Sequence, residues 1–89
     1  MEYRFVFDEA KSVANKAKHG IDFIEAQAIW LDDRPLQIAG RTGTEDRFIV
    51  IGRIADKHWS AVVTYRGDRV RLISVRRSRK QEVAAYEGE

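Results

Sequence analysis

The chain has 89 residues, of which 44% are hydrophobic, with a formal net charge of +2 and no cysteine. This length predicts one small domain, residues 1–89, and the hydrophobic fraction excludes an intrinsically disordered chain. The lack of cysteine excludes disulfides and thiolate metal sites. No apolar run approaches the roughly 20 residues of a transmembrane helix, and the N-terminus lacks a signal-peptide pattern, so we expect a cytoplasmic protein without a membrane partner.

Two helices are expected in the N-terminal third. Residues 3–7 form either a short strand or an apolar lead-in to the first helix. Asp8 is a good N-cap for a helix over residues 9–18, and Gly20 is its expected stop. Helical spacing predicts a narrow buried face of Ala10, Val13, Ala14 and Ala17. Asp22 and Glu25 have capping-box spacing, which predicts a second helix that buries Phe23, Ala26, Ile29 and Trp30.

Four strands and a third helix are expected after the helix break at Pro35. The segments rich in β-branched and aromatic residues are 36–39, 47–54, 59–65 and 70–76, and residues 40–44 are expected to form a mobile connection. Short turns at 55–57 and 66–68 predict antiparallel hairpins. Ser78 is the expected cap of a last helix that ends near Tyr86. The predicted fold class is therefore α+β: two N-terminal helices, a four-stranded antiparallel meander sheet and a C-terminal helix.

Basic residues concentrate in and around the last strand. Between Arg66 and Lys80 the chain has seven basic residues and one acid. Strict alternation would place Arg71, Ile73 and Val75 on one face and Val70, Leu72, Ser74 and Arg76 on the other. Arginines held on a strand suggest a partner rich in phosphate or carboxylate.

Motifs spread along nearly the whole chain share one order and spacing with a known family. They are Phe7-Asp8-x-x-Lys11-x-x-x-Asn15-x-x-Lys18-His19-Gly20-Ile21-x-Phe23-x-x-Ala26, Glu45-x-Arg47, Ile51-Gly52, Val62-Val63-x-Tyr65-x-x-Gly67, Arg71-x-Ile73-Ser74-x-Arg76, and Glu82 with Tyr86. On these residues the chain resembles the BrnT toxins. It departs from the family at Val75 and Ser78, where the family usually has Ala; neither difference removes a charged group.

The resemblance implies a compact fold similar to the RelE toxins and a role as the toxin of a bacterial type II toxin–antitoxin pair. It implies a ribonuclease that arrests translation by cutting RNA. It also implies neutralisation by a BrnA-like antitoxin in a hetero-oligomer, with operator DNA bound only through the antitoxin. No cofactor and no metal are expected.

RNA cleavage without a metal requires a proton acceptor for the 2′-hydroxyl, stabilisation of the phosphorane charge and a proton donor for the leaving oxygen. His19, at a helix C-terminus with Lys18 beside it, is the first candidate for proton transfer. The alternative is that both side chains only cap the helix carbonyls. Glu45 is a candidate base, and the alternative is structural pairing with Arg47. Arg76 is the main candidate for charge stabilisation.

The remaining candidates bind RNA phosphates. Arg77 accompanies Arg76 at the strand-to-helix junction, Arg47 and Arg71 are expected to line the same groove from their strands, and Arg66 reaches it from a turn. For each, the alternative is an ion pair, a solvated charge or a contact with an acidic antitoxin. Two other functions use the same basic strand: a non-catalytic nucleic-acid-binding module and a protein-interaction domain. His19 and His58 lack the spacing of a zinc site.

Overall fold

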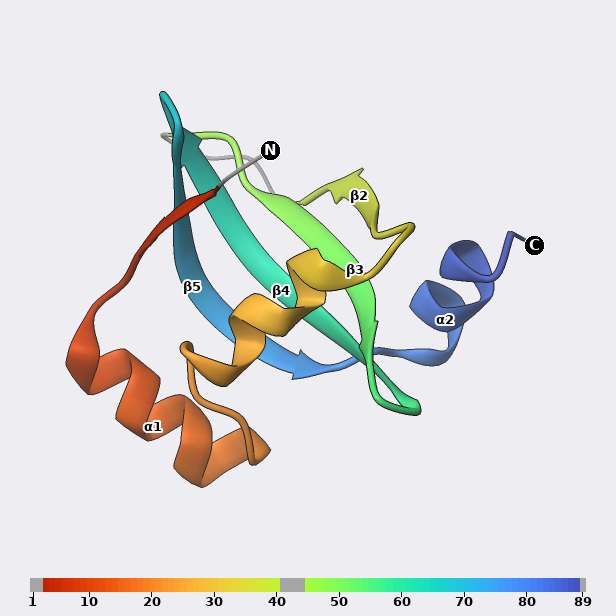
Figure 1. Cartoon of the computed structure of the whole chain (residues 1–89), viewed down its shortest axis with the longest axis horizontal. Helices are drawn as coiled ribbons and strands as arrows, with labels where there is room; N and C mark the ends of the chain where they lie inside the picture. The colour runs from red at the N-terminus through yellow and green to blue at the C-terminus, as the bar shows by residue number, and fades with distance from the viewer. Residues whose placement is uncertain (1–2, 41–44, 89) are drawn as a thin grey trace.

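A computed structural model of the chain describes residues 3–40 and 45–88 (Figure 1). Its elements, in chain order, are β1 (Arg4–Val6), α1 (Glu9–His19), the 3₁₀ helix η1 (Glu25–Leu31), β2 (Leu36–Ala39), β3 (Phe48–Ile54), β4 (Lys57–Arg66), β5 (Arg69–Arg77) and α2 (Lys80–Tyr86). The predicted mobile connection falls mostly on residues 41–44, outside the described residues. No helix in the described segments is long and apolar enough to cross a membrane.

The five strands form one mixed sheet in the order β1-β5-β4-β3-β2. The α+β class and the antiparallel run from β2 to β5 agree with prediction, but the four-stranded, purely antiparallel sheet was wrong. The apolar lead-in supplies a fifth strand, β1, which pairs in parallel with β5 from Arg4 opposite Arg69 to Val6 opposite Arg71. Pairing between segments this far apart in the sequence leaves no local signal.

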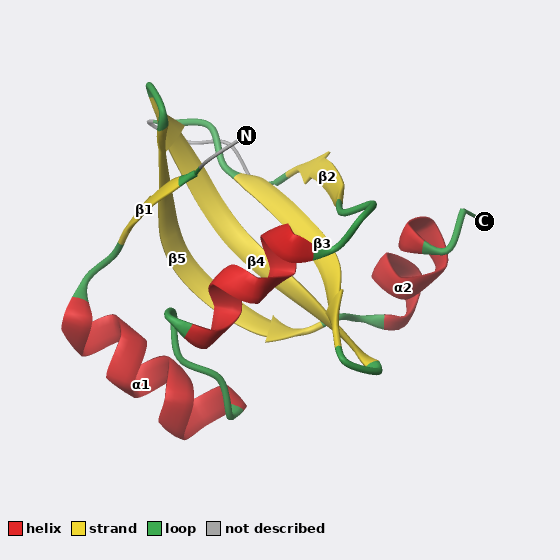
Figure 2. Ribbon diagram, in the orientation of Figure 1, coloured by secondary structure: helices red, strands yellow, loops and turns green. Residues whose placement is uncertain are grey.

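The hydrophobic core lies on one face of the sheet. Figures 1 and 2 show η1 crossing this face, α1 beside β5, and α2 away from both. Its buried residues come from the segment before η1, from η1 and from the three central strands: Ile21, Phe23, Ala26, Ile29, Val50, Trp59, Ala61, Val63, Val70, Leu72 and Val75. Edge-to-face aromatic contacts extend this core. The ring centroids of Phe5 and Trp30 lie 5.0 Å apart, and those of Phe7 and Phe23 lie 5.6 Å apart. This layer closes one face of the sheet, and α2 packs on the other.

Helix α1 begins and ends as expected but turns a different side inward. The Asp8 carboxylate accepts from the Lys11 amide at 3.1 Å, and Gly20 ends the helix with φ +82°. The predicted buried face was wrong, because Ala10, Val13, Ala14 and Ala17 are exposed. The buried residues of α1 are polar, Ser12 and Asn15. Their side chains are satisfied by backbone groups, so a count of apolar residues could not find this face.

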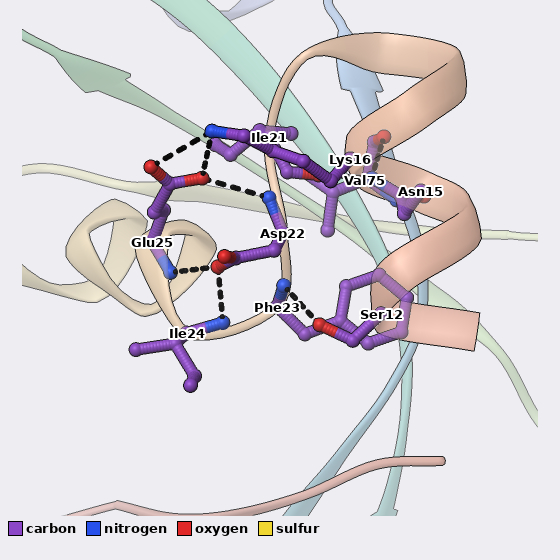
Figure 3. A network of polar contacts seen from close by, with 9 residues as sticks. All are labelled: Ser12, Asn15, Lys16, Ile21, Asp22, Phe23, Ile24, Glu25 and Val75. Atoms are coloured by element: carbon purple, nitrogen blue, oxygen red, sulfur yellow. Dashed lines mark hydrogen bonds and ion pairs between the residues drawn. The ribbon is translucent and has the colours of Figure 1, made fainter. Parts of the chain in front are cut away.

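Asn15 attaches α1 to the open edge of β5 (Figure 3). Its amide nitrogen donates to the carbonyl oxygens of Val75 at 2.9 Å and Ile21 at 2.8 Å, and its oxygen accepts from the Val75 amide at 3.1 Å. The pairing with β1 stops at Arg71, so Val75 has no strand on that side. Asn15 therefore replaces a neighbouring strand at this point and fixes the C-terminal end of α1 against the end of β5.

The capping box before η1 is confirmed. The Asp22 carboxylate accepts from the Glu25 amide at 2.7 Å, and the Glu25 carboxylate accepts from the Asp22 amide at 2.9 Å (Figure 3). Lys16 pairs with Glu25 at 2.8 Å, lowering the pKa of Glu25 and raising that of Lys16. The element is a 3₁₀ helix rather than the expected α-helix. It lies close to β3, where a Cβ on Gly52 would stand 2.9 Å from the Ile29 oxygen.

Candidate active site

A β-bulge in β5 decides which residues face the core. Val63 pairs with Leu72 and Val62 pairs with Ser74, so Ile73 is an extra residue in the ladder. The extra residue reverses the alternation, and Val70, Leu72 and Val75 all point into the core. The predicted faces of this strand were therefore wrong beyond Leu72.

The same bulge gathers arginines on the opposite face. Arg69 pairs with Arg66, Arg71 with Thr64, and Arg76 with Ser60. These pairs alternate with pairs that face the core. Arg66, Arg69, Arg71 and Arg76 therefore share the other face, which we call the arginine face. Arg47 immediately precedes Phe48, whose partner Val63 points into the core, so Arg47 extends toward the arginine face as well.

Arg76 is held by an ion pair with α2. Its guanidinium donates to both carboxylate oxygens of Glu82, each at 2.8 Å, and only 8% of the Glu82 side chain is exposed. The Ser60 hydroxyl and the Arg79 amide donate to the same carboxylate. The hydrogen bonds from Arg76 are the main cause that lowers the pKa of Glu82 to about 2, and this carboxylate raises the pKa of Arg76. Arg76 is thus rigid, and part of its bonding capacity is used.

The start of α2 differs from the expectation. The N-cap is Arg79, and the Ser78 hydroxyl bonds the Ser60 hydroxyl at 2.7 Å. Glu82 closes the first turn by accepting from the Arg79 amide at 2.8 Å. Together these contacts place α2 over the Ser60 end of the arginine face and leave the Thr64 end uncovered by α2.

His19 and Lys18 lie at the end of α1. His19 follows Ser12 and Asn15 on one helical stripe and is partly buried, while Lys18 is exposed. The Asn15 contact holds this stripe against Val75, so the helix end lies near the end of β5, where Arg76 and Arg77 follow. No hydrogen bond joins His19 or Lys18 to an arginine of the described residues.

Comparison with known proteins identifies the family. Residues 7–82 match the model of a family described as "Ribonuclease toxin, BrnT, of type II toxin-antitoxin system". The chain belongs to the BrnT family. A search of curated proteins found no match. The match covers every predicted site residue and ends at Glu82, the partner of Arg76. BrnT proteins are ribonuclease toxins of type II systems, which implies an RNA substrate and an antitoxin partner.

Other predicted site residues of this BrnT protein are placed apart from one another. Arg77 pairs with Trp59 in the ladder, on the core side, and its guanidinium stacks 5.5 Å from the Trp59 ring centroid. Arg76 and Arg77 therefore start from opposite faces of the sheet. Glu45 pairs with Arg66 at 3.1 Å, not with Arg47, and both partners are exposed.

Two residues gain partners that sequence reasoning missed. His58 Nε2 lies 2.8 Å from a Glu87 carboxylate oxygen and its ring packs edge-on against Tyr86 at 5.1 Å. The Tyr86 hydroxyl donates to Asp32 at 2.5 Å, and Asp32 also accepts from the Arg34 and Arg53 amides. The bond to Asp32 raises the pKa of Tyr86 to about 12. No sequence spacing joins these residues, and they anchor α2.

Residues 3–40 and 45–88 contain no group of three or more His, Asp or Glu side chains that could hold a metal ion. Two hollows stand out in the described surface. One of about 400 Å³ lies beside Arg34, Arg53 and Tyr86. Another of about 640 Å³ is apolar and lies along η1 beside Phe5, Trp30 and Leu31, on the side away from the arginine face.

Proposed function

We propose that this BrnT protein is a metal-independent endoribonuclease that inhibits translation in the cytoplasm. The observation that carries the proposal is the arginine face itself, because arginines of β4 and β5 lie together there on a rigid sheet, with Arg47 just before β3. Guanidinium groups fixed in this way bind phosphates and stabilise charge that develops during cleavage.

The proposed reaction is attack of the substrate 2′-hydroxyl on the adjacent phosphate, leaving a cyclic phosphate end. His19 is proposed as the general acid, since histidine is the side chain that most often transfers protons in catalysis and His19 lies at the C-terminus of α1. Lys18 stands next to it as an exposed second cation. Arg76 is proposed to stabilise the phosphorane from a position that Glu82 fixes. Glu45 is a weaker candidate for the base, because its carboxylate is already engaged in an exposed ion pair with Arg66.

Antitoxin-free protein tests the proposal. It should cut single-stranded RNA in the presence of a metal chelator and leave cyclic phosphate ends. His19→Ala should abolish cleavage while its thermal unfolding stays close to that of the wild type, and His58→Ala serves as the control histidine. Cleavage that stops when the chelator is added rejects metal independence, and undiminished cleavage by folded His19→Ala rejects the role of His19.

A second candidate is a toxin-fold protein that binds nucleic acid without cutting it. The Arg76–Glu82 pair favours this candidate, because a guanidinium that already donates two hydrogen bonds to a carboxylate has fewer donors left for a transition state. Binding of RNA without cleavage under all conditions would support it. A protein-interaction domain alone would show neither binding nor cleavage.

We also propose that the antitoxin is BrnA-like and forms a hetero-oligomer with this chain. Acidic antitoxin side chains would occupy the arginine positions on the arginine face and exclude RNA. Operator DNA would be bound only through the antitoxin.

A further inference from the structure

Thr64 lies on the arginine face, at the end that α2 does not cover. It stands directly opposite Arg71 on β5, with Arg66 two residues ahead of it on β4 and Arg69 diagonally across the ladder. On the other side, the β3–β4 register brings Arg47 alongside it, one residue beyond the Phe48–Val63 pair. Four arginines from three segments therefore surround one threonine.

The Thr64 hydroxyl has no hydrogen-bond partner in the described part of the chain, although the residue is 1% exposed. The other buried polar side chains are all bonded: Ser12, Asn15, Ser60 and Glu82. An unsatisfied buried hydroxyl is unfavourable, and each such group in a native structure requires an explanation. A bound ligand that takes this hydrogen bond would provide one.

The charges around Thr64 indicate an anion. The Arg66 guanidinium is paired with Glu45, and Asp68 lies 3.7 Å from Arg4 in an exposed pair. Arg47, Arg69 and Arg71 form no ion pair with any described residue. Their long side chains can reorient, so an incoming anion can reach the hydroxyl once they turn toward it. The next row of the arginine face, toward Ser60, is Ile49, Val62 and Ser74, so the cluster of arginines ends there.

We propose that Thr64 and the arginines around it form a phosphodiester-binding subsite for the backbone of single-stranded RNA, in which the threonine hydroxyl donates to a phosphate oxygen. The subsite rests on the proposed function and extends it. Thr64 lies four residues from Ser60 on β4, about 13 Å at roughly 3.3 Å per residue, so the subsite holds a phosphate distant from the one beside Arg76. It binds the strand and does not take part in bond cleavage.

Binding of a short 2′-O-methyl oligoribonucleotide, which cannot be cut, tests the subsite without requiring activity. Thr64→Val keeps the side-chain shape and removes the hydroxyl. It should weaken the affinity roughly tenfold, as expected for a lost hydrogen bond to a charged group. Its melting temperature should be equal to or above that of the wild type, because the hydroxyl has no partner in the free protein. Thr64→Ser restores the hydroxyl and should restore the affinity.

Arg71→Ala provides a second measurement that does not depend on Thr64. Loss of one phosphate contact to a single strand should reduce the slope of log affinity against log salt by about 0.7. Wild-type affinity in folded Thr64→Val overturns the subsite. If Thr64→Val does not fold, an unchanged salt slope in Arg71→Ala overturns it instead.

The outcome for the wild type separates this inference from the proposed function. A wild type that binds the oligonucleotide but never cuts natural RNA rejects the nuclease and leaves the subsite to be decided by the two variants. A wild type that binds no RNA overturns both.

Discussion

Glu82 is the residue whose role changes most between sequence and structure. From the sequence alone, Glu82 is simply an acidic residue in the first turn of the expected C-terminal helix. In the folded protein it binds Arg76, Ser60 and the Arg79 amide from a buried position. A buried carboxylate with this many donors is stabilised in its ionised form. Its role is to fix Arg76, and that role can be measured through protein stability.

The pH dependence of unfolding should reveal this carboxylate. Its pKa falls from 4.5 to about 2 on folding, so its contribution is complete above 4.5 and is lost as the pH drops toward 2. The difference corresponds to about 3 kcal/mol. Glu82→Gln should therefore be less stable at neutral pH, and its stability should converge with that of the wild type near pH 2. Urea unfolding at a series of pH values measures this.

Glu25→Gln is the matched control, since Glu25 also pairs with a cation but is exposed. It should change stability far less, because exposed pairs contribute little. If the unfolding free energy of Glu82→Gln falls between pH 4.5 and pH 2 as much as that of the wild type and of Glu25→Gln, the buried pair does not stabilise the fold.

Asn15 provides a second test at the residue scale. Asn15→Ala removes both partners from the Val75 backbone and one from the Ile21 carbonyl. We expect a loss of roughly 2 kcal/mol or more in unfolding free energy, because buried backbone groups lose their hydrogen bonds. Lys11→Ala, on the exposed side of the same helix, should stay within about 0.5 kcal/mol of the wild type. Equal stability of the two variants in urea would show that α1 is not held through Asn15.

At the scale of elements, the sequence predicted what depends on neighbours in the chain. The Asp8 cap, the Gly20 stop, the Asp22–Glu25 box and both hairpin turns are local signals, and each is present. The parallel pairing of β1 and the bulge at Ile73 depend on distant segments. The inward side of α1 was missed because its buried groups are polar.

The candidate site was predictable only in composition. Arg47, Arg71 and Arg76 do share a face. Strict alternation along β5 does not explain this for Arg71 and Arg76, because they are five positions apart; the bulge at Ile73 does. Without the bulge these two side chains would face opposite ways. No sequence pattern singles out Thr64, because only the folded register places it among the arginines.

Helix α2 should be anchored by its last residue as well as by Glu82. The bond to Asp32 raises the pKa of Tyr86 to about 12, so it should be the last tyrosine to ionise in an absorbance titration. Because the phenol is held protonated in the folded state, this anchor is complete below pH 10 and weakens as the pH rises to 12. Tyr86→Phe should remove the late titration step.

Two other variants isolate the cause. Asp32→Asn should bring the ionisation of Tyr86 back toward the usual value of 10. Tyr65→Phe should still show the tyrosine ionisation near pH 12 in the absorbance titration, although burial also raises the pKa of Tyr65. A late step that persists in Tyr86→Phe would assign it to another tyrosine.

At the scale of the whole molecule, the two sides of the sheet offer different surfaces to a partner. One is the arginine face. The other lies over α1 and η1, where Val13 is 68% exposed, Ile24 65% and Leu31 83%. Apolar hollows of about 640 Å³ and 420 Å³ meet there at Ile24. A partner that inhibits by mimicking RNA must use the first surface, where the clustered arginines make binding strongly sensitive to salt.

Salt and two variants should show which surface the antitoxin covers. If acidic antitoxin residues replace phosphates, affinity should fall as salt rises, and Arg71→Ala should weaken the complex and flatten that dependence. Leu31→Ser, on the opposite side, should leave the affinity nearly unchanged. Titration calorimetry with purified antitoxin at several salt concentrations measures both effects. An affinity indifferent to salt but lost in Leu31→Ser would place the antitoxin on the apolar side, and inhibition would then require a mechanism other than phosphate mimicry.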